Sequence, residues 1–326
     1  MFRQFSRTNV FLQLVTIIAV ALVLFLPVII NPFPSLAARD INPLYAFFSA
    51  VLGDAALLKA ILAMCILLFL SFFLFAMLGS HDMHPRESML PALFYLLLSA
   101  GLIESVSFSP ALIASLFLMM SLFLIIRIFG SNQPFKQIFS ASFCVSVAAL
   151  FYPPAMTFML FIWLSFLTYR IASWREWVIS LIGAFVPLIY IISYFYWIGG
   201  LPEMFINYGV IFSNPYAGFP TFRLWQAIFI GFAGIAMVLG LLRQIILIQD
   251  KLISIRRKTW VFIDFTIIAL LSSLLAGNDL PGHLTIIAIP GALFLSNSVT
   301  GKKASLTYEL LAVLLVILLV FARLSA

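Results

Sequence analysis

Charged residues are scarce in this sequence. Only 9% of its 326 residues are Asp, Glu, Lys or Arg, whereas 64% are hydrophobic, and the mean hydropathy is +1.18. A water-soluble domain of this length needs far more polar surface, so the composition excludes a soluble globular protein and predicts one embedded in a lipid bilayer. Any charge that falls outside a loop therefore needs a physical reason to be there.

Cysteine is scarce as well. Cys65 and Cys144 both fall within apolar stretches without a metal-like spacing or a neighbouring His, so we expect them to pack in the interior. Two such thiols exclude a disulfide framework and indicate no redox motif. Long polar loops are also missing, since none exceeds about 25 residues. The sequence therefore predicts a single integral membrane domain over residues 1–326.

Apolar stretches, in contrast, are abundant. A helix needs about 20 apolar residues to cross about 30 Å of hydrocarbon. The pattern predicts an all-α polytopic membrane protein with about eleven transmembrane helices, several of them short or re-entrant, and an uncleaved first span. The predicted spans are 9–30, 55–78, 89–104, 109–128, 137–151, 155–170, 176–198, 223–243, 259–276, 283–298 and 307–323.

The distribution of Lys and Arg predicts the orientation. Nearly all basic residues fall in loops on one face, and the exceptions are Arg39, Lys59, Arg223 and Arg323. Basic loops stay in the cytoplasm, so we expect a bacterial cytoplasmic (inner) membrane protein with its N-terminus inside and its C-terminus outside. The membrane explains the net charge of +7 without nucleic acid. The basic cluster at 251–258 either fixes this orientation, which we favour, or touches anionic headgroups.

One pair of predicted spans is joined by an unusually tight turn. Only Tyr152-Pro153-Pro154 separates 137–151 from 155–170. The turn must lie below the membrane surface, where protein or water surrounds its backbone groups. The alternative is one long kinked helix, but the basic residues that flank the pair favour two re-entrant spans. Short spans imply a cavity that opens outward.

The first outer loop contains a candidate functional carboxylate. Asn42-Pro43 predicts the start of a short helix over 42–53, apolar enough to lie in the outer membrane interface. Asp40 precedes this helix by two residues. Either Asp40 has a functional role at the membrane surface, or it caps the helix or pairs with Arg39.

Two further outer segments carry candidate binding residues. The segment 199–223 is rich in aromatic and amide side chains and includes Glu203 and Tyr208. These suit a sugar or a lipid headgroup, although ordinary interfacial aromatics are the commoner explanation. Asp279 and His283 are expected to face one outward cavity, as a carboxylate and an imidazole within reach of a phosphate.

Three more charges lie near the outer ends of predicted spans. Glu104 ends the short third span, and we prefer a simple interfacial carboxylate to a substrate ligand there. Arg223 contradicts the charge distribution, which a phosphate-binding role would explain. Lys59 either extends its ammonium group outward to water or binds the same anion.

The inner loop contains the residues His81, Asp82, His84 and Glu87. Their spacing is irregular, and no predicted helix sets their geometry. We therefore favour a solvated loop over a metal site. Asp264 lies near an inner helix end, where it pairs with a lysine such as Lys258 or stays in water.

The layout of these features resembles the GT-C membrane glycosyltransferases. The resemblance rests on Asp40 in the first outer loop, on Asn42-Pro43-Leu44-Tyr45 at the start of the interfacial helix, on paired short spans after Ser109-Pro110, and on a late span from His283 to Pro290. It implies transfer of a sugar from a polyprenyl-phosphate-linked donor to an acceptor at the outer face. The chain is also similar to multi-pass membrane proteins of Bacteroidota, a likeness that implies no activity.

The same resemblance implies roles for individual residues. Asp40 would be the catalytic residue, as a base for the acceptor or as a ligand of a divalent metal ion, while Arg223 with Lys59 or His283 would hold the donor phosphate. The family often has an acidic pair in this loop, whereas Asp40 stands alone. Two alternatives stay open: a transporter or flippase of a lipid-linked or small solute, and a non-catalytic subunit of an envelope assembly.

Overall fold

A computed structural model of the whole chain describes most of its residues. The described ranges are 2–6, 8–30, 43–53, 55–102, 108–130, 134–171, 173–202, 205–206, 222–300 and 306–324. Over these ranges the secondary structure is helical and includes no strand. Short helices accompany the spans: α1 (Phe2–Phe5), α3 (Pro43–Leu52), and the 3-10 turns η3 (Ile248–Asp250) and η4 (Gly277–Asp279).

Eight helices in this part of the chain are long and apolar enough to cross a membrane. They are α2 (Val10–Ile30), α4 (Ala56–Ser80), α6 (Pro110–Ile128), α7 (Pro134–Phe151), α9 (Trp174–Trp197), α11 (Leu224–Leu247), α13 (Leu280–Thr300) and α14 (Leu306–Leu324). Three further segments lie among them: α5 (Leu90–Ser99), η2 (Pro153–Thr157) with α8 (Phe158–Tyr169), and α12 (Ile253–Ser273). A helical segment thus occupies every predicted span, and the all-α polytopic fold is confirmed.

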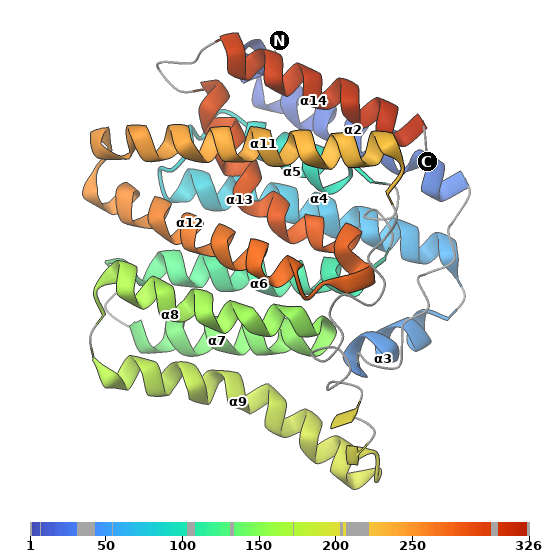
Figure 1. Cartoon of the computed structure of the whole chain (residues 1–326), viewed down its shortest axis with the longest axis vertical. Coiled ribbons are helices and arrows are strands. Elements are labelled where there is room, and N and C mark those ends of the chain that lie inside the picture. Colours follow the sequence, from blue (N-terminus) through green and yellow to red (C-terminus); the bar gives the residue numbers. More distant parts are fainter. Residues whose placement is uncertain are drawn as a thin grey trace.

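The helices lie side by side, with their loops at two opposite ends (Figure 1). At one end α4, α6 and α8 finish and α12 begins; we call it the basic end, because most of the described basic residues lie there. The basic residues of this end whose side chains are described are Arg86, Arg127, Lys136, Arg170, Arg175, Arg243, Lys251, Arg256, Arg257 and Lys258. We call the other the α3 end. The charge asymmetry therefore follows the topology, and the cytoplasmic position of the basic end stays a prediction.

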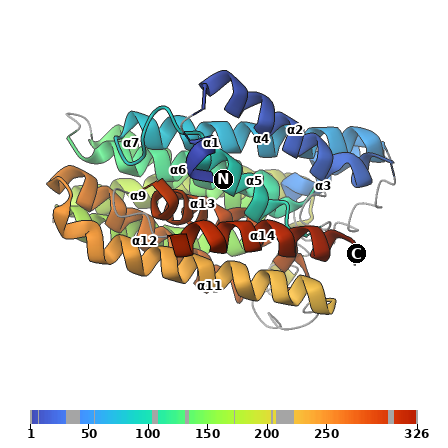
Figure 2. The same cartoon turned by 90° about the horizontal axis from the view of Figure 1, so that it is seen from above.

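The helix α13 forms the centre of the bundle, and it packs against α5, α6, α11 and α12. The helices α9, α11 and α14 lie at the periphery and expose apolar side chains, as expected for surfaces that face lipid (Figures 1 and 2). Cys65 also lies on an exposed face of α4 rather than in the interior. The peripheral helix α9 packs closely against α7, because a Cβ at Gly183 of α9 would lie 2.6 Å from the Phe139 carbonyl oxygen of α7.

The tight turn after α7 has the predicted form of two separate spans. The helix α7 ends at Phe151, Tyr152 is extended, and η2 then leads into α8. Pro153 and Pro154 are buried in protein, which shields the backbone groups that the turn removes from helical pairing. The third span is shorter than predicted, because α5 ends at Ser99.

One basic residue that contradicted the predicted charge distribution has a structural role. The guanidinium of Arg323, near the end of α14, turns into the bundle. It donates to the carbonyl oxygen of Ala100, just after α5, and over 2.9 Å to that of Leu24 in α2. Arg323 thus links α14 to backbone acceptors of two other helices, α2 and α5, at the α3 end.

Candidate functional site

Half of the predicted site residues lie in the described part of the chain. Asp40, Glu104, Glu203 and Tyr208 lie outside it. Asp279, His283, Lys59 and Arg223 are described, and all four come from elements at the α3 end. Asp279 and His283 lie one helical turn apart, at the start of α13. Lys59 is in the first turn of α4, and Arg223 immediately precedes α11.

The helix α3 is anchored to the bundle by Tyr45. This side chain is almost fully buried, and its hydroxyl donates to the Phe108 carbonyl oxygen over 2.8 Å. The two rings also stack, with centroids 5.8 Å apart. Phe48 packs on Phe151 at the end of α7. The predicted helix over 42–53 therefore exists, and it is held against the ends of α6 and α7, directly after the segment that contains Asp40.

Beside this anchor lies a buried carboxylate, that of Asp279. Both of its oxygens are inaccessible, and neither accepts a hydrogen bond from a described residue. A Cβ at Gly282 would lie 2.5 Å from Asp279 Oδ1 and 2.8 Å from Ser109 Oγ, so these two oxygens flank the same side of the glycine. Only glycine leaves room for both at this position.

The Asp279 carboxylate faces the N-terminus of α6. Ser109 caps this helix, because its Oγ accepts from the Leu112 N–H over 3.2 Å. Burial raises the pKa of Asp279 to about 7, and the nearby backbone N–H of Ala111 partly offsets this effect. Burial, and secondly the Asp279 charge, raise the pKa of the Tyr45 phenol to about 12. The helix N-terminus is therefore the main favourable partner for negative charge at this site.

His283 is fully buried, and both of its ring nitrogens have partners. Nδ1 lies 3.1 Å from the Tyr152 hydroxyl, while Nε2 lies 2.9 Å from the Ala269 carbonyl oxygen and 3.1 Å from Ser272 Oγ. A carbonyl only accepts, so Nε2 carries the proton and Nδ1 accepts from Tyr152. The structure thus places His283 in the core, where it joins α7, α12 and α13, rather than facing outward to a phosphate.

Lys59 is buried as well, with 8% of its surface exposed. Its ammonium group lies 3.4 Å from Ser49 Oγ of α3, at the limit of a hydrogen bond. Arg223 is exposed, and its backbone N–H donates to Gln226 Oε1 in the first turn of α11. The α3 end therefore contains the cationic side chains of Lys59, Arg223 and Arg323 in addition to the Asp279 carboxylate.

The inner loop differs from its prediction. Asp82 and Glu87 are exposed, but His84 is buried, with Nδ1 2.8 Å from Asn297 Oδ1. Asp264 accepts from Thr168 Oγ1 over 2.6 Å, and the predicted partner Lys258 lies beside His81 instead. In the described ranges, no three His, Cys, Asp or Glu side chains come together as a possible metal site.

The sequence did not indicate that Tyr45, Ser109, Tyr152 and Gly282 lie around Asp279 and His283. The Ser109-Pro110 pair is a helix-start signal, and Tyr152 precedes the Pro-Pro turn, so both positions had a local signal. Nothing local indicates that they meet the η4 turn, because they come from segments more than a hundred residues apart.

These features define a class of protein: a multi-pass helical membrane protein with a buried carboxylate, at one end of its spans, that has no hydrogen-bond donor among the described residues. The chain belongs to DUF6427, a family of unknown function, which it matches over residues 1–326. No curated protein and no solved structure matches it.

Proposed function

We propose that this protein is a GT-C-like glycosyltransferase that moves a sugar from a polyprenyl-phosphate-linked donor to an acceptor hydroxyl at the α3 end. The observation that supports it best is the buried Asp279 carboxylate, which lies beside the anchored helix α3 and the α6 N-terminus. A carboxylate with a near-neutral pKa suits proton transfer at physiological pH.

The proposed chemistry assigns a role to each charged group. The bond between the sugar C1 and the donor phosphate oxygen breaks, the acceptor oxygen bonds to C1, and the acceptor proton passes to a carboxylate. By the resemblance, Asp40 is that base, and Asp279 supplies the second carboxylate that the first outer loop lacks. Lys59 and Arg223 stabilise the departing phosphate, because cationic donors offset its growing negative charge.

The test is a transfer assay with protein in lipid nanodiscs. The probes are undecaprenyl-phosphate-linked radiolabelled mannose, glucose and arabinose, each with a bacterial membrane extract as acceptor, with and without added Mg²⁺. We expect the wild type to transfer at least one label, and Asp40→Asn and Asp279→Asn each to lower the rate about 100-fold or more. The control is Asp82→Asn, which changes an exposed carboxylate at the basic end.

Two outcomes contradict the proposal. One is wild-type protein that transfers none of the three sugars. The other is a pair of carboxylate variants, folded like the wild type by their thermal unfolding, that both keep the wild-type rate.

A proton-coupled carrier is the second candidate, and the same unpaired carboxylate favours it. In liposomes that contain a pH-sensitive dye, a carrier moves protons in step with its solute, and Asp279→Asn abolishes this movement. A transferase instead forms product without any proton flux across the bilayer.

A further inference from the structure

Three basic side chains from three different elements meet at the basic end. His81 directly follows α4, Arg127 lies in the last turn of α6, and Lys258 lies in α12. Nδ1 of His81 is 3.4 Å from Nζ of Lys258. Phe123 packs against both His81 and Arg127. Its ring centroid lies 5.9 Å from that of His81 and 5.3 Å from the Arg127 guanidinium carbon.

The protonation of His81 follows from this contact. An ammonium group only donates, so Nδ1 of His81 accepts and Nε2 carries the proton. This Nε2–H group is buried and has no acceptor in the described part of the chain. A buried donor without an acceptor is destabilising, so this N–H group favours a bound acceptor.

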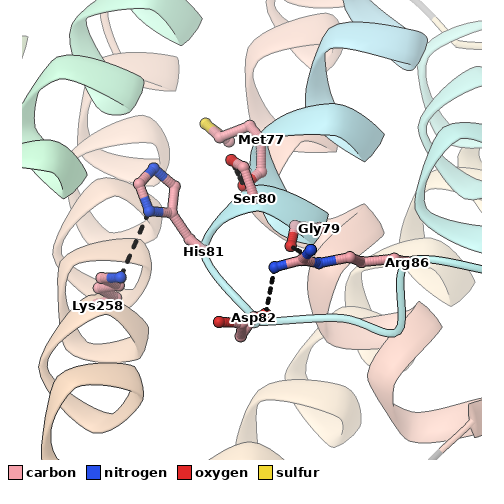
Figure 3. Close-up of polar contacts among 7 residues, drawn as sticks. All are labelled: Met77, Gly79, Ser80, His81, Asp82, Arg86 and Lys258. Carbon is pink, nitrogen blue, oxygen red and sulfur yellow. Dashed lines mark hydrogen bonds and ion pairs between the residues drawn. The ribbon is translucent and has the colours of Figure 1, made fainter.

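The neighbouring carboxylate is engaged elsewhere. Asp82 pairs with Arg86 over 3.0 Å, and Arg86 also donates to the Gly79 carbonyl oxygen. Figure 3 shows this pair on one side of the loop, while His81 projects the other way, toward Lys258. Within the described ranges, His81, Arg127 and Lys258 thus present N–H donors that no carboxylate pairs with.

The charges around His81 agree with this arrangement. Burial is the main cause that lowers its pKa to about 4, and the positive charges of Lys258 and Arg127 lower it further, whereas Asp82 acts in the opposite direction. An anion between these groups would relieve their mutual repulsion and accept from the orphaned Nε2–H.

We propose that His81, Arg127 and Lys258 bind a phosphate group at the basic end of the bundle. Its oxygens accept from all three side chains, and Phe123 supports the imidazole and the guanidinium. The site lies where the spans meet the membrane surface, so the phosphate belongs either to an anionic phospholipid headgroup or to a free phosphate compound. The proposal is independent of the transferase activity, because it concerns the opposite end of the spans.

The experiment follows the imidazole signals of protein labelled at its three histidines. In maltoside micelles, which contain no phosphate, His81 should titrate near pH 4. If lipid supplies the phosphate, nanodiscs of phosphatidylglycerol should raise this pKa by at least about one unit. If the source is soluble, micelles with added inorganic phosphate should do so. A His81 titration that is the same in all three media overturns the proposal.

Variants separate binding from folding. Arg127 is exposed, so Arg127→Gln should keep the fold and weaken the apparent phosphate affinity about fivefold or more, and Lys258→Gln should do the same. The matched control is Arg86→Gln. It removes a cation from the loop that contains His81, but this cation is already paired with Asp82. Equal losses for the Arg86 and Arg127 variants would reveal a general surface charge effect and contradict a specific site.

Discussion

The Tyr152 hydroxyl donates a hydrogen bond to Nδ1 of His283 over 3.1 Å, and both side chains are buried. This contact joins the Pro153-Pro154 turn to the central helix α13. It fixes this turn in place because the imidazole is itself held by Ala269 and Ser272 of α12.

Tyr152→Phe should lower the free energy of unfolding by about 1–3 kcal/mol, because the variant leaves Nδ1 of His283 buried without a donor. Thermal unfolding in detergent, followed by tryptophan fluorescence, measures the change. Tyr190→Phe is the control, since Tyr190 of α9 is 75% exposed and should lose nothing. Equal melting temperatures for the Tyr152 variant and wild type would contradict a structural role for this contact.

Gly282→Ala should destabilise the protein by about 1–3 kcal/mol, because the added methyl group collides with Asp279 Oδ1 and Ser109 Oγ. Gly234→Ala in α11 is the matched control. A Cβ there meets nothing within 4 Å, so the same change should stabilise the helix by about 0.5–1 kcal/mol. The same unfolding assay checks both. An alanine at 282 that is as well tolerated as one at 234 would mean that the carboxylate is not packed against this glycine.

The pH dependence of stability should report Asp279. Its pKa is raised from 3.8 to about 7 in the folded state, so the folded state holds this proton more tightly than the unfolded state. The stabilising contribution is complete below about pH 4 and is lost as the pH rises through 7. The side chain of the Asp279→Asn variant cannot ionise. The melting temperature of the variant minus that of the wild type should therefore increase between pH 4 and 7, and this difference should stay constant above pH 7. Parallel profiles across this range would disprove the shift, and Asp82→Asn provides the comparison.

Arg323→Met should cost about 1.5–3 kcal/mol, because it removes charge-assisted hydrogen bonds to the Ala100 and Leu24 carbonyl oxygens. Arg175→Met, which replaces an exposed arginine at the start of α9, should cost almost nothing. Chemical unfolding of the two purified variants gives this difference directly. If both lose the same amount, then Arg323 acts only through its charge at the helix end.

The sequence predicted the spans well because each depends on its own composition. The first span was expected at 9–30 and is Val10–Ile30, and the helix expected at 42–53 is Pro43–Leu52. The predicted helix boundaries were wrong where polar residues lie inside a helix. The span expected to begin at 259 begins at Ile253, because two of its basic residues contact neighbouring elements: Arg257 donates to the Tyr169 carbonyl oxygen, and Lys258 lies beside His81.

The candidate site was less predictable. Asp279 and His283 are four positions apart in the sequence, but the expectation that both face one outward cavity was wrong, because His283 is fully buried in the core. Their orientation was not predictable, because it depends on neighbours distant in sequence: Ser109 and Ala111 beside the carboxylate, and Tyr152, which bonds to the imidazole. His81 and Lys258 are likewise 177 residues apart, so no local pattern indicates their contact.

The sequence by itself determined that this chain is a helical membrane protein, where its spans lie and on which face its basic residues gather. Each of these depends on the transfer free energy of a continuous segment, which is a sum over neighbouring residues. Only the tertiary structure decided which face of each helix is buried, that no cation of the described ranges pairs with Asp279 and that Arg323 turns inward. Those outcomes depend on packing and hydrogen bonding between distant segments, where the alternative to each contact is an unsatisfied polar group inside the bundle.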